Sequence, residues 1–436
     1  MLSLAVAASW CSAPPLMQWK KPKRLGVILN KFPSFLPKEV DNIKDQFARE
    51  LATRIERLPV SFSDSCTMSS CVKPSIQSKE CPVVLLHGFD SSCLEWRYTY
   101  PLLEEAGFET WAVDILGWGF SDLERLPPCD VTSKRVHLYQ LWKSYIKRPM
   151  VLVGPSLGAA VAIDFAVNYP EAVDRLVLID ASVYAEGTGN LATLPRLIAY
   201  AGVFLLKSIP LRLYVNVLAF TGISLSTSLD WVNIGRLHCL LPWWEDATVS
   251  FMLSGGYNVS SQIEKVKQKT LIIWGEDDQI ISNKLAVRLH CELPNAFIRQ
   301  IPECGHLPHV EKPNFVAKLI TQFVHEDSRK ENIDHQNVTV AAKKNKLKAA
   351  AVRPAAALPS MLFPLPPKPT LPVGLIPLPN TDGEVVVEGG GVDGFVVVPS
   401  VALGTVVDGV VLVGVPVLLE TEKGVHLFMS LSLMQT

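Results

Sequence analysis

Short apolar runs alternate with segments of helical periodicity along the middle of the chain. Buried strands are predicted where the runs are short and continuous, at 82–88, 109–114, 150–154, 174–180, 269–275 and 296–302. Helices are predicted where apolar residues recur at helical spacing, over 95–107, 132–147, 157–169 and 312–325. Such alternation is typical of an α/β fold, a mostly parallel central sheet with helices on both faces. We therefore expect one α/β core over residues 80–326.

The alternation stops between Asp180 and Thr270. Residues 191–253 are instead rich in leucine and aromatic residues. Because this segment falls between two expected strands, we interpret residues 185–260, approximately, as an inserted helical lid rather than as ordinary packing helices. Its apolar composition also suggests peripheral membrane contact through the lid.

Both flanks of the core differ from it in composition. Residues 39–58 carry apolar residues at helical spacing, so 39–79 is predicted to be an amphipathic helix and an N-terminal lead-in to the core. Residues 327–436 form a low-complexity tail, first Pro-rich and then Val/Gly-rich, which we expect to be disordered. The run 396–419 has the length of a membrane span, but Asp408 near its middle argues against that interpretation.

The N-terminal residues 1–38 contain six basic residues and no Asp or Glu. Their apolar stretch precedes the basic cluster KKPKR, which is the reverse of a secretory signal. This composition predicts an organellar transit peptide, for the chloroplast or alternatively the mitochondrion. A basic N-terminus without a targeting role is the other interpretation.

Composition narrows the classes of partner. The 436 residues are 48% hydrophobic and carry a formal net charge of -1, with no basic stripe interleaved with aromatic residues, so nucleic acid is not an expected partner. The nine cysteines are scattered and form no C-x-x-C pair, which favours a reducing compartment over a disulfide framework. The sequence shows no metal-ligand cluster and no cofactor-binding loop, so we expect neither a metal nor a cofactor.

The candidate chemistry begins at GPSLG, residues 154–158. This G-x-S-x-G pattern lies directly between an expected strand and an expected helix, the context of a nucleophile elbow. Gly154 and Gly158 leave room for a sharp turn that projects the Ser156 hydroxyl above the edge of the sheet. The N-terminus of the following helix offers N–H groups to a developing oxyanion.

A serine nucleophile needs a base, and the base needs an orienting acid. Asp278 follows an expected strand 122 residues after Ser156, and His306 follows the next strand 28 residues further on. This is the chain order Ser, Asp, His. The oxyanion hole is expected to use the backbone N–H groups of Leu157, directly after the nucleophile, and of Phe89, after the first long strand.

Five motifs occur in the order found in the α/β-hydrolase superfamily: HG at 87–88, DILGWGFSD at 114–122, GPSLG, WGEDD and GHLPHVEKP. Over residues 80–326 the chain therefore resembles that superfamily, and its leader and apolar lid resemble the plant organellar lipid and prenyl-ester hydrolases. The family spacing G-x-x-D selects Asp278 over Asp277, and G-H-x-P selects His306 over His309. The resemblance also implies that His87 shapes the oxyanion loop.

Two departures from the family bear on activity. Pro155 stands where relatives often have His, Asn or Gln, so contacts before the nucleophile can differ. Relatives that open epoxides or cleave carbon–halogen bonds use Asp as nucleophile, so Ser156 argues against both activities. Asp180 is an alternative acid, but we expect it to be a structural hydrogen-bonding residue. Trp243 and Trp244 are expected to be packing residues, and contact with the substrate is the alternative for them.

Together these features predict a serine hydrolase that cleaves a carboxylic ester through an acyl-enzyme. The lid composition suggests a small-molecule substrate with an apolar acyl or prenyl part. The same residues fit an acyltransferase or another acyl or C–C bond hydrolase. A non-enzymatic ligand receptor that keeps the hydrolase pocket is the alternative from another class.

Overall fold

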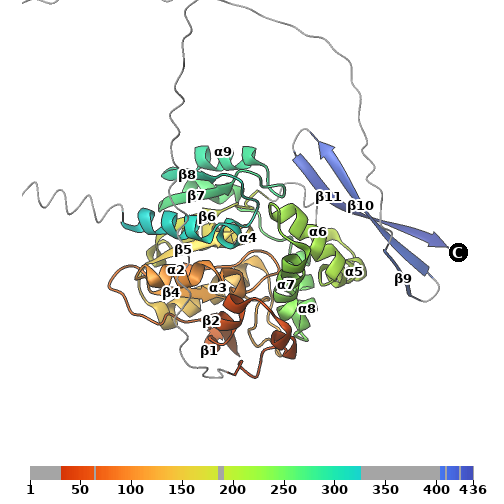
Figure 1. The fold of residues 1–436 in the computed structure, drawn as a ribbon, viewed down its shortest axis with the longest axis horizontal. Coiled ribbons are helices and arrows are strands. Elements are labelled where there is room, and N and C mark those ends of the chain that lie inside the picture. The colour runs from red at the N-terminus through yellow and green to blue at the C-terminus, as the bar shows by residue number, and fades with distance from the viewer. Residues whose placement is uncertain are drawn as a thin grey trace, which may run out of the picture.

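A computed structural model describes residues 31–62, 65–184 and 191–325, together with the backbone of three strands between residues 403 and 435. The expected transit peptide lies almost wholly outside the described residues, as does most of the tail. The described part contains the α/β core, its lead-in and the inserted helices (Figure 1).

An eight-stranded sheet forms the centre of the core, in the order β1-β2-β4-β3-β5-β6-β7-β8. The strands are β1 (Ile55–Phe62), β2 (Ser65–Val72), β3 (Val83–Leu85), β4 (Thr110–Val113), β5 (Met150–Pro155), β6 (Val173–Ile179), β7 (Lys269–Gly275) and β8 (Ala296–Ile301). All pairs among β3 to β8 are parallel, whereas β2 is antiparallel to both β1 and β4. The predicted mostly parallel sheet is therefore confirmed.

Helices cover both faces of this sheet, as the sequence predicted. Neighbouring strand residues point to opposite faces, so Val84 and Leu152 pack with α3 (Val131–Leu141), α4 (Leu157–Asn168) and α9 (Asn283–Glu292). Val83 and Val151 pack with α1 (Gln46–Ala52), α2 (Thr99–Glu105) and a helix over residues 313–325. Each large apolar side chain buried in these layers stabilises the fold by about 1.5–3 kcal/mol.

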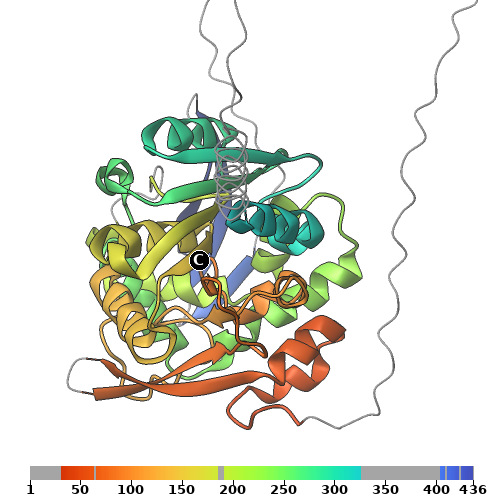
Figure 2. The ribbon, with the colours of Figure 1, turned by 90° about the vertical axis from the view of Figure 1, so that its left-hand side faces the viewer.

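The lead-in differs from the predicted amphipathic helix over 39–58. A 3-10 turn over Lys38–Asn42 precedes the short helix α1, which Asp45 caps by accepting a hydrogen bond from the Ala48 N–H. Strand β1 then begins at Ile55 and pairs with β2, and together they form one end of the sheet (Figure 2). Helical spacing in this stretch was misleading because Ile55 and Leu58 are buried on opposite faces of a strand.

Part of the expected disordered tail has regular backbone. Strands β9 (Leu403–Val407), β10 (Val410–Thr421) and β11 (Gly424–Gln435) form an antiparallel three-stranded sheet. The sequence leaves both disorder and weak strand structure open for this Val/Gly-rich stretch, and these residues form strands, because Val-rich runs separated by short breaks can pair as hairpins.

The predicted helical insertion lies between β6 and β7. It contains α5 (Arg196–Leu206), α6 (Ile209–Ala219), α7 (Leu225–Arg236) and α8 (Trp244–Leu253), which Figure 1 shows in green to one side of the sheet. In the described part of the chain, no single helix combines the length and apolar character needed to cross a membrane. Helices α5 and α6 meet that test only as a pair, with their axes bent by 70°.

The turn from β5 into α4 is closed by two glycines. A Cβ at Gly154 would overlap the backbone carbonyl of Gly158, and a Cβ at Gly158 would lie 2.6 Å from the carbonyl oxygen of His87. Helix α4 can therefore cross strand β5 and the loop after β3 only without side chains at these two positions. Ser156, between them, has φ +48° and ψ -121°.

We expect Gly154→Ala to lower the free energy of unfolding by about 3 kcal/mol or more, because the added methyl meets rigid backbone. The matched control is Gly202→Ala in α5, where a Cβ would meet nothing within 4 Å. That change should leave stability unchanged or raise it by about 0.5–1 kcal/mol. Chemical denaturation of the two variants measures the difference, and equal stabilities would contradict the close approach at Gly154.

Candidate active site

The loops that follow β3, β5, β6, β7 and β8 bring the candidate residues together. They carry Phe89, Ser156, Asp180, Asp278 and His306, respectively. Because parallel strands end at the same edge of a sheet, side chains far apart in the sequence meet there. This edge is the carboxyl end of the sheet.

Backbone hydrogen bonds hold Ser156 in its turn. Its N–H donates to the Ile179 carbonyl at 2.8 Å, and its carbonyl accepts from the N–H groups of Ala159 and Ser182 at 3.0 and 3.1 Å. A non-glycine residue at φ +48° costs about 1–3 kcal/mol, and these bonds keep it there. The side chain is partly exposed and its hydroxyl has no hydrogen-bond partner among the described residues, so it is accessible to a substrate.

Asp278 and His306 form a buried hydrogen-bonded pair. His306 Nδ1 lies 2.8 Å from Asp278 Oδ2, and the two side chains expose 6% and 0% of their surface. The other carboxylate oxygen of Asp278 accepts from the N–H groups of Ile280 and Ile281 at 2.7 and 3.0 Å. With Nδ1 donating to Asp278, Nε2 of His306 is the nitrogen left to accept a proton.

The electrostatics favour an ionised Asp278. Burial by itself raises the pKa of this carboxyl, but the charge and hydrogen bond of His306 and the two backbone N–H groups outweigh burial and lower the pKa. Asp277 is exposed and makes no side-chain contact with His306. The structure therefore brings His306 to Asp278 and not to its neighbour.

Asp180 lies beside this pair. Its Oδ1 accepts from the Gly275 N–H at 2.9 Å, and ligand atoms of Asp180, Asp278 and His306 all lie within 4.8 Å of one another. Burial and the neighbouring Asp278 charge raise the pKa of Asp180 well above its usual value. A proton on Oδ2, which otherwise has no partner, allows Asp180 to donate a hydrogen bond to Asp278. Burial and the neighbouring charge thus both disfavour ionisation of Asp180.

The loop after β3 approaches the nucleophile closely. A Cβ on Gly88 would lie 3.6 Å from the Cβ of Ser156, and the N–H of the next residue, Phe89, is not used in any hydrogen bond of the described residues. Leu157 is the first residue of α4, so its N–H has no intrahelical acceptor. Two backbone N–H groups without an acceptor among the described residues therefore belong to the segments next to Ser156.

Three buried side chains hold this loop. His87 donates from Nδ1 to the Gly88 carbonyl at 2.8 Å and accepts the Ile115 N–H on Nε2 at 3.0 Å, and burial lowers its pKa, so it stays neutral. Glu95 accepts from the Gly88 N–H and from His309 Nε2, the latter at 2.8 Å. Burial opposes ionisation of Glu95, but its contact with His309 dominates and lowers the pKa of this carboxyl.

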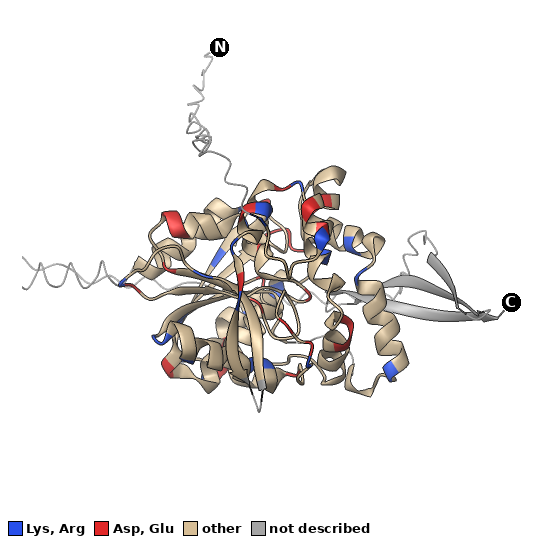
Figure 3. Ribbon diagram, turned by 90° about the horizontal axis from the view of Figure 1, so that it is seen from below, with Lys and Arg blue, Asp and Glu red and all other residues tan. Residues whose placement is uncertain are grey.

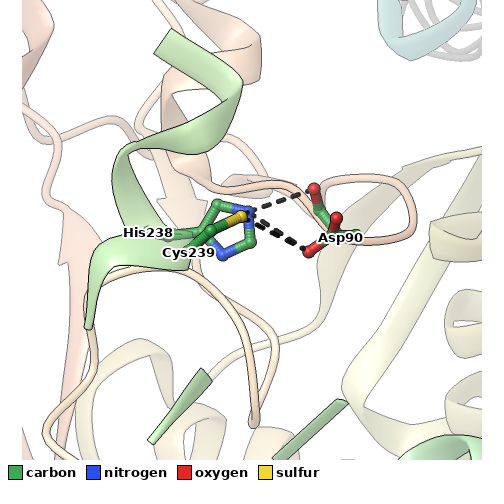
Figure 4. A group of neighbouring side chains, drawn as sticks. All are labelled: Asp90, His238 and Cys239. Atoms are coloured by element: carbon green, nitrogen blue, oxygen red, sulfur yellow. Dashed lines mark hydrogen bonds and ion pairs between the residues drawn. The ribbon is translucent and has the colours of Figure 1, made fainter. Parts of the chain in front are cut away.

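Asp90 links the same loop to the inserted helices (Figure 4). Its carboxylate is paired with Arg212 of α6 and accepts from the Trp244 indole N–H at 2.7 Å, while its carbonyl oxygen lies 3.1 Å from His238 Nε2. Asp90, His238 and Cys239 are close enough to surround a metal ion. The Arg212 guanidinium already neutralises Asp90, and burial raises the pKa of the Cys239 thiol well above its usual value. This group therefore fits an ion pair between core and insertion rather than a metal.

A cavity opens beside the oxyanion loop. Phe89 and Leu307, the residue after His306, form part of its wall, and neither Ser156 nor His306 lines it. Most of the remaining wall is apolar and comes from the insertion, at Leu206, Leu211, Val215, Phe220, Trp231, Val232 and Ile234. The cavity therefore lies between the core loop and helices α6 and α7, next to the candidate catalytic groups.

The charged residues in the cavity wall have partners in the protein. Arg97 pairs with Asp45 at 3.1 Å, while Arg212 pairs with Asp90 and Glu95 with His309. The amide of Asn216 donates to Ser228. The cavity thus presents an apolar interior with its charges already neutralised.

The sequence analysis missed several residues of this site. Glu95, Asp90 and Arg212 were not singled out, and no role was assigned to His309, which is fully buried against Glu95. The signal in the sequence that could have identified such residues is a charged residue within an apolar stretch. A charge buried there needs a partner. The tryptophans are packing residues as expected, because Trp244 is buried on Asp90 and Trp243 packs in a small apolar cluster.

Comparisons with known proteins agree with this architecture. A model of the alpha/beta hydrolase family matches residues 83–319. The alpha/beta hydrolase domain-containing protein VTE7 of Arabidopsis thaliana is 65% identical over 298 residues, covering 67% of this chain and 90% of that protein. A 2-hydroxy-6-oxononadienedioate/2-hydroxy-6-oxononatrienedioate hydrolase of Cupriavidus pinatubonensis is 27% identical over 260 residues, covering 56% and 86%.

Among solved structures, a thermophilic esterase from Thermogutta terrifontis has the same fold. Its TM-score is 0.54 at 18% sequence identity, and the match covers 62% of this chain and 98% of the esterase. The strand order, the turn at Ser156 and the family match over more than half of the chain lead to one conclusion. This chain belongs to the alpha/beta hydrolase family.

Proposed function

We propose that this protein is a serine hydrolase that cleaves a carboxylic ester through an acyl-enzyme. The observation that carries the proposal is the buried 2.8 Å hydrogen bond between Asp278 and His306 at the sheet edge where Ser156 is held in its turn. The pair supplies an oriented base at the same edge of the sheet as the accessible hydroxyl, and a serine nucleophile requires such a base. In this structure the Ser156 hydroxyl and His306 are not hydrogen-bonded to each other.

Each residue then has a defined task. His306 Nε2 takes the proton of Ser156 as its oxygen attacks the ester carbonyl, and later gives that proton to the leaving alcohol. Ionised Asp278 holds the tautomer of His306 and stabilises the imidazolium that forms. The N–H groups of Phe89 and Leu157 donate to the carbonyl oxygen as it gains charge. Water then releases the acid and restores Ser156.

The proposed substrate is an ester with a long apolar part, acyl or prenyl. The cavity beside Phe89 is lined mostly by apolar side chains, and its charged residues are paired within the protein. Aromatic rings extend this wall, since Phe89 packs edge-on against Trp118 with ring centroids 5.2 Å apart. An anionic or cationic substrate would have to break an existing ion pair to bind there.

C–C bond hydrolysis is the second candidate. One relative is named as a 2-hydroxy-6-oxononadienedioate/2-hydroxy-6-oxononatrienedioate hydrolase, and hydrolysis of such a compound is of this class. Such a substrate carries two carboxylates, which the apolar, internally neutralised cavity does not favour. Analysis of products from an ester and from a vinylogous diketo acid separates the two activities.

The first prediction concerns the nucleophile and the substrate. Turnover of p-nitrophenyl esters by the full chain should rise from two to sixteen acyl carbons, because longer chains bury more apolar surface in the cavity. Ser156→Ala should lower kcat by about 10⁵-fold or more without lowering thermal stability. Highest turnover on the shortest ester would contradict the substrate class, and retained activity in the variant would contradict the nucleophile.

The second prediction separates the three aspartates. Asp278→Asn should lower kcat by about 10³- to 10⁴-fold, because the amide cannot stabilise the imidazolium of His306. Asp180→Asn should cost less than about tenfold, because an amide resembles the protonated carboxyl that the raised pKa implies. Asp277→Asn is the exposed control and should have no effect. A larger loss at Asp180 than at Asp278 would reverse the assignment of the acid.

We also propose a chloroplast location. The support is the acid-poor, basic N-terminus together with the plant origin of the 65% identical relative. The expected result is import of the full chain into isolated chloroplasts with removal of an N-terminal segment. Import into mitochondria in a parallel assay, with none into chloroplasts, would contradict this location.

A further inference from the structure

The solvent-facing side of α5 is apolar throughout. Residues at positions i, i+1, i+4, i+7 and i+8 share one face of a helix, and here they are Leu197, Ile198, Ala201, Phe204 and Leu205. Leu197 exposes 83% of its surface and Phe204 53%. The opposite side carries Ala199 and Val203, which are buried in the main core cluster. Among the described residues, none therefore packs over the outer face of α5 at Leu197 and Phe204.

Helix α6 has two sides with different surroundings. One side lines the cavity, through Leu211, Arg212, Val215 and Asn216. The other consists of Ile209, Pro210, Leu213, Tyr214 and Val217, of which Val217 exposes 67% of its surface. A surface helix normally has charged or polar residues on that second side.

The charge of this region is one-sided. Residues 191–229 contain no Asp or Glu, so they carry no red in Figure 3, while red and blue positions are spread over the core. Their cations are Arg196, Lys207 and Arg212, of which Lys207 pairs with Glu245 of α8 at 3.8 Å and Arg212 pairs with Asp90. Arg196 is exposed at the start of α5, at the edge of the apolar face. An apolar face with an exposed cation at its edge and no acidic residue of its own is complementary to a lipid surface that contains anionic headgroups.

We propose that the outer faces of α5 and α6 dock on the surface of a lipid bilayer. We call this the lid surface, defined by Leu197, Ile198, Phe204, Ile209 and Val217. Each helix of 11 residues is about 16 Å long, which is too short to cross a hydrocarbon core of about 30 Å. With axes bent by 70°, the pair lies in the interface rather than across it.

Docking in this way places the cavity next to the lipid. Helix α6 separates the two, with one side on the cavity and the other on the bilayer. An apolar substrate dissolved in the membrane then reaches the oxyanion loop by passing α6 without entering water. This route of entry rests on the proposed function, whereas the docking itself does not.

The test measures flotation of the full chain with vesicles. Wild type should float with vesicles of phosphatidylcholine and phosphatidylglycerol, and less with phosphatidylcholine alone. The double variant Leu197→Glu with Phe204→Glu should reduce the bound fraction about tenfold or more, because both side chains would insert. The matched control is Val287→Glu with Phe315→Glu, two apolar residues of similar exposure, 59% and 57%, on α9 and on the helix over 313–325. That control should float like wild type.

Hydrolysis of a short soluble ester is measured on the same three proteins. Equal rates would show that both double variants are folded, since none of the four residues lies in the catalytic machinery. Absence of turnover in wild type and in both variants would count against the proposed function. The flotation result would not be affected, because it does not depend on catalysis.

Three results would overturn the docking proposal. Equal flotation of all three proteins would place lipid contact elsewhere in the chain, for example in residues 1–38. A wild-type dimer in light scattering that the Leu197/Phe204 variant dissociates, with no flotation of either, would assign the lid surface to a second copy. Flotation only after deletion of residues 327–436 would show that the chain's own tail covers it.

Discussion

The close approach of α4 to β5 and to the loop after β3 is the constraint on which the site depends. Backbone meets backbone at Gly154 and Gly158, and no side chain fits at either position. At this contact Ser156 has a positive φ, and the loop after β3 approaches its Cβ closely at Gly88. The cost of the strained turn is offset by the apolar layers that α4 buries against the sheet.

Around this turn, buried charges are balanced in pairs. Glu95 with His309 fixes the oxyanion loop from the core side, and Asp90 with Arg212 ties it to the insertion. Asp278 is hydrogen-bonded to His306, while burial and the neighbouring Asp278 charge raise the pKa of Asp180 and so disfavour its ionisation. Of the three candidate aspartates, Asp278 is the one that contacts His306.

The insertion between β6 and β7 contacts the core with one side, and its other side faces outward. Its inner residues supply most of the apolar wall of the cavity and the partner of Asp90. Its outer residues in α5 and α6 remain apolar and exposed. The proposed lipidic substrate and the proposed lipid contact of the lid are consistent with one another, because the cavity wall and the outer side of the insertion are both mostly apolar.

The sequence by itself determined the class of fold and the order of the key residues. The length of the apolar runs was sufficient to predict the long buried strands, and the G-x-S-x-G motif between a strand and a helix was sufficient to predict the turn at Ser156. Both patterns depend on local geometry. Local periodicity failed at Ile55 and Leu58, because three-residue spacing also suits a strand buried on both faces. The tertiary structure alone decided the rest. The partners of Glu95 and Asp90 and the side of α6 that is left exposed depend on contacts between residues distant in sequence, and such contacts leave no periodic pattern in the sequence.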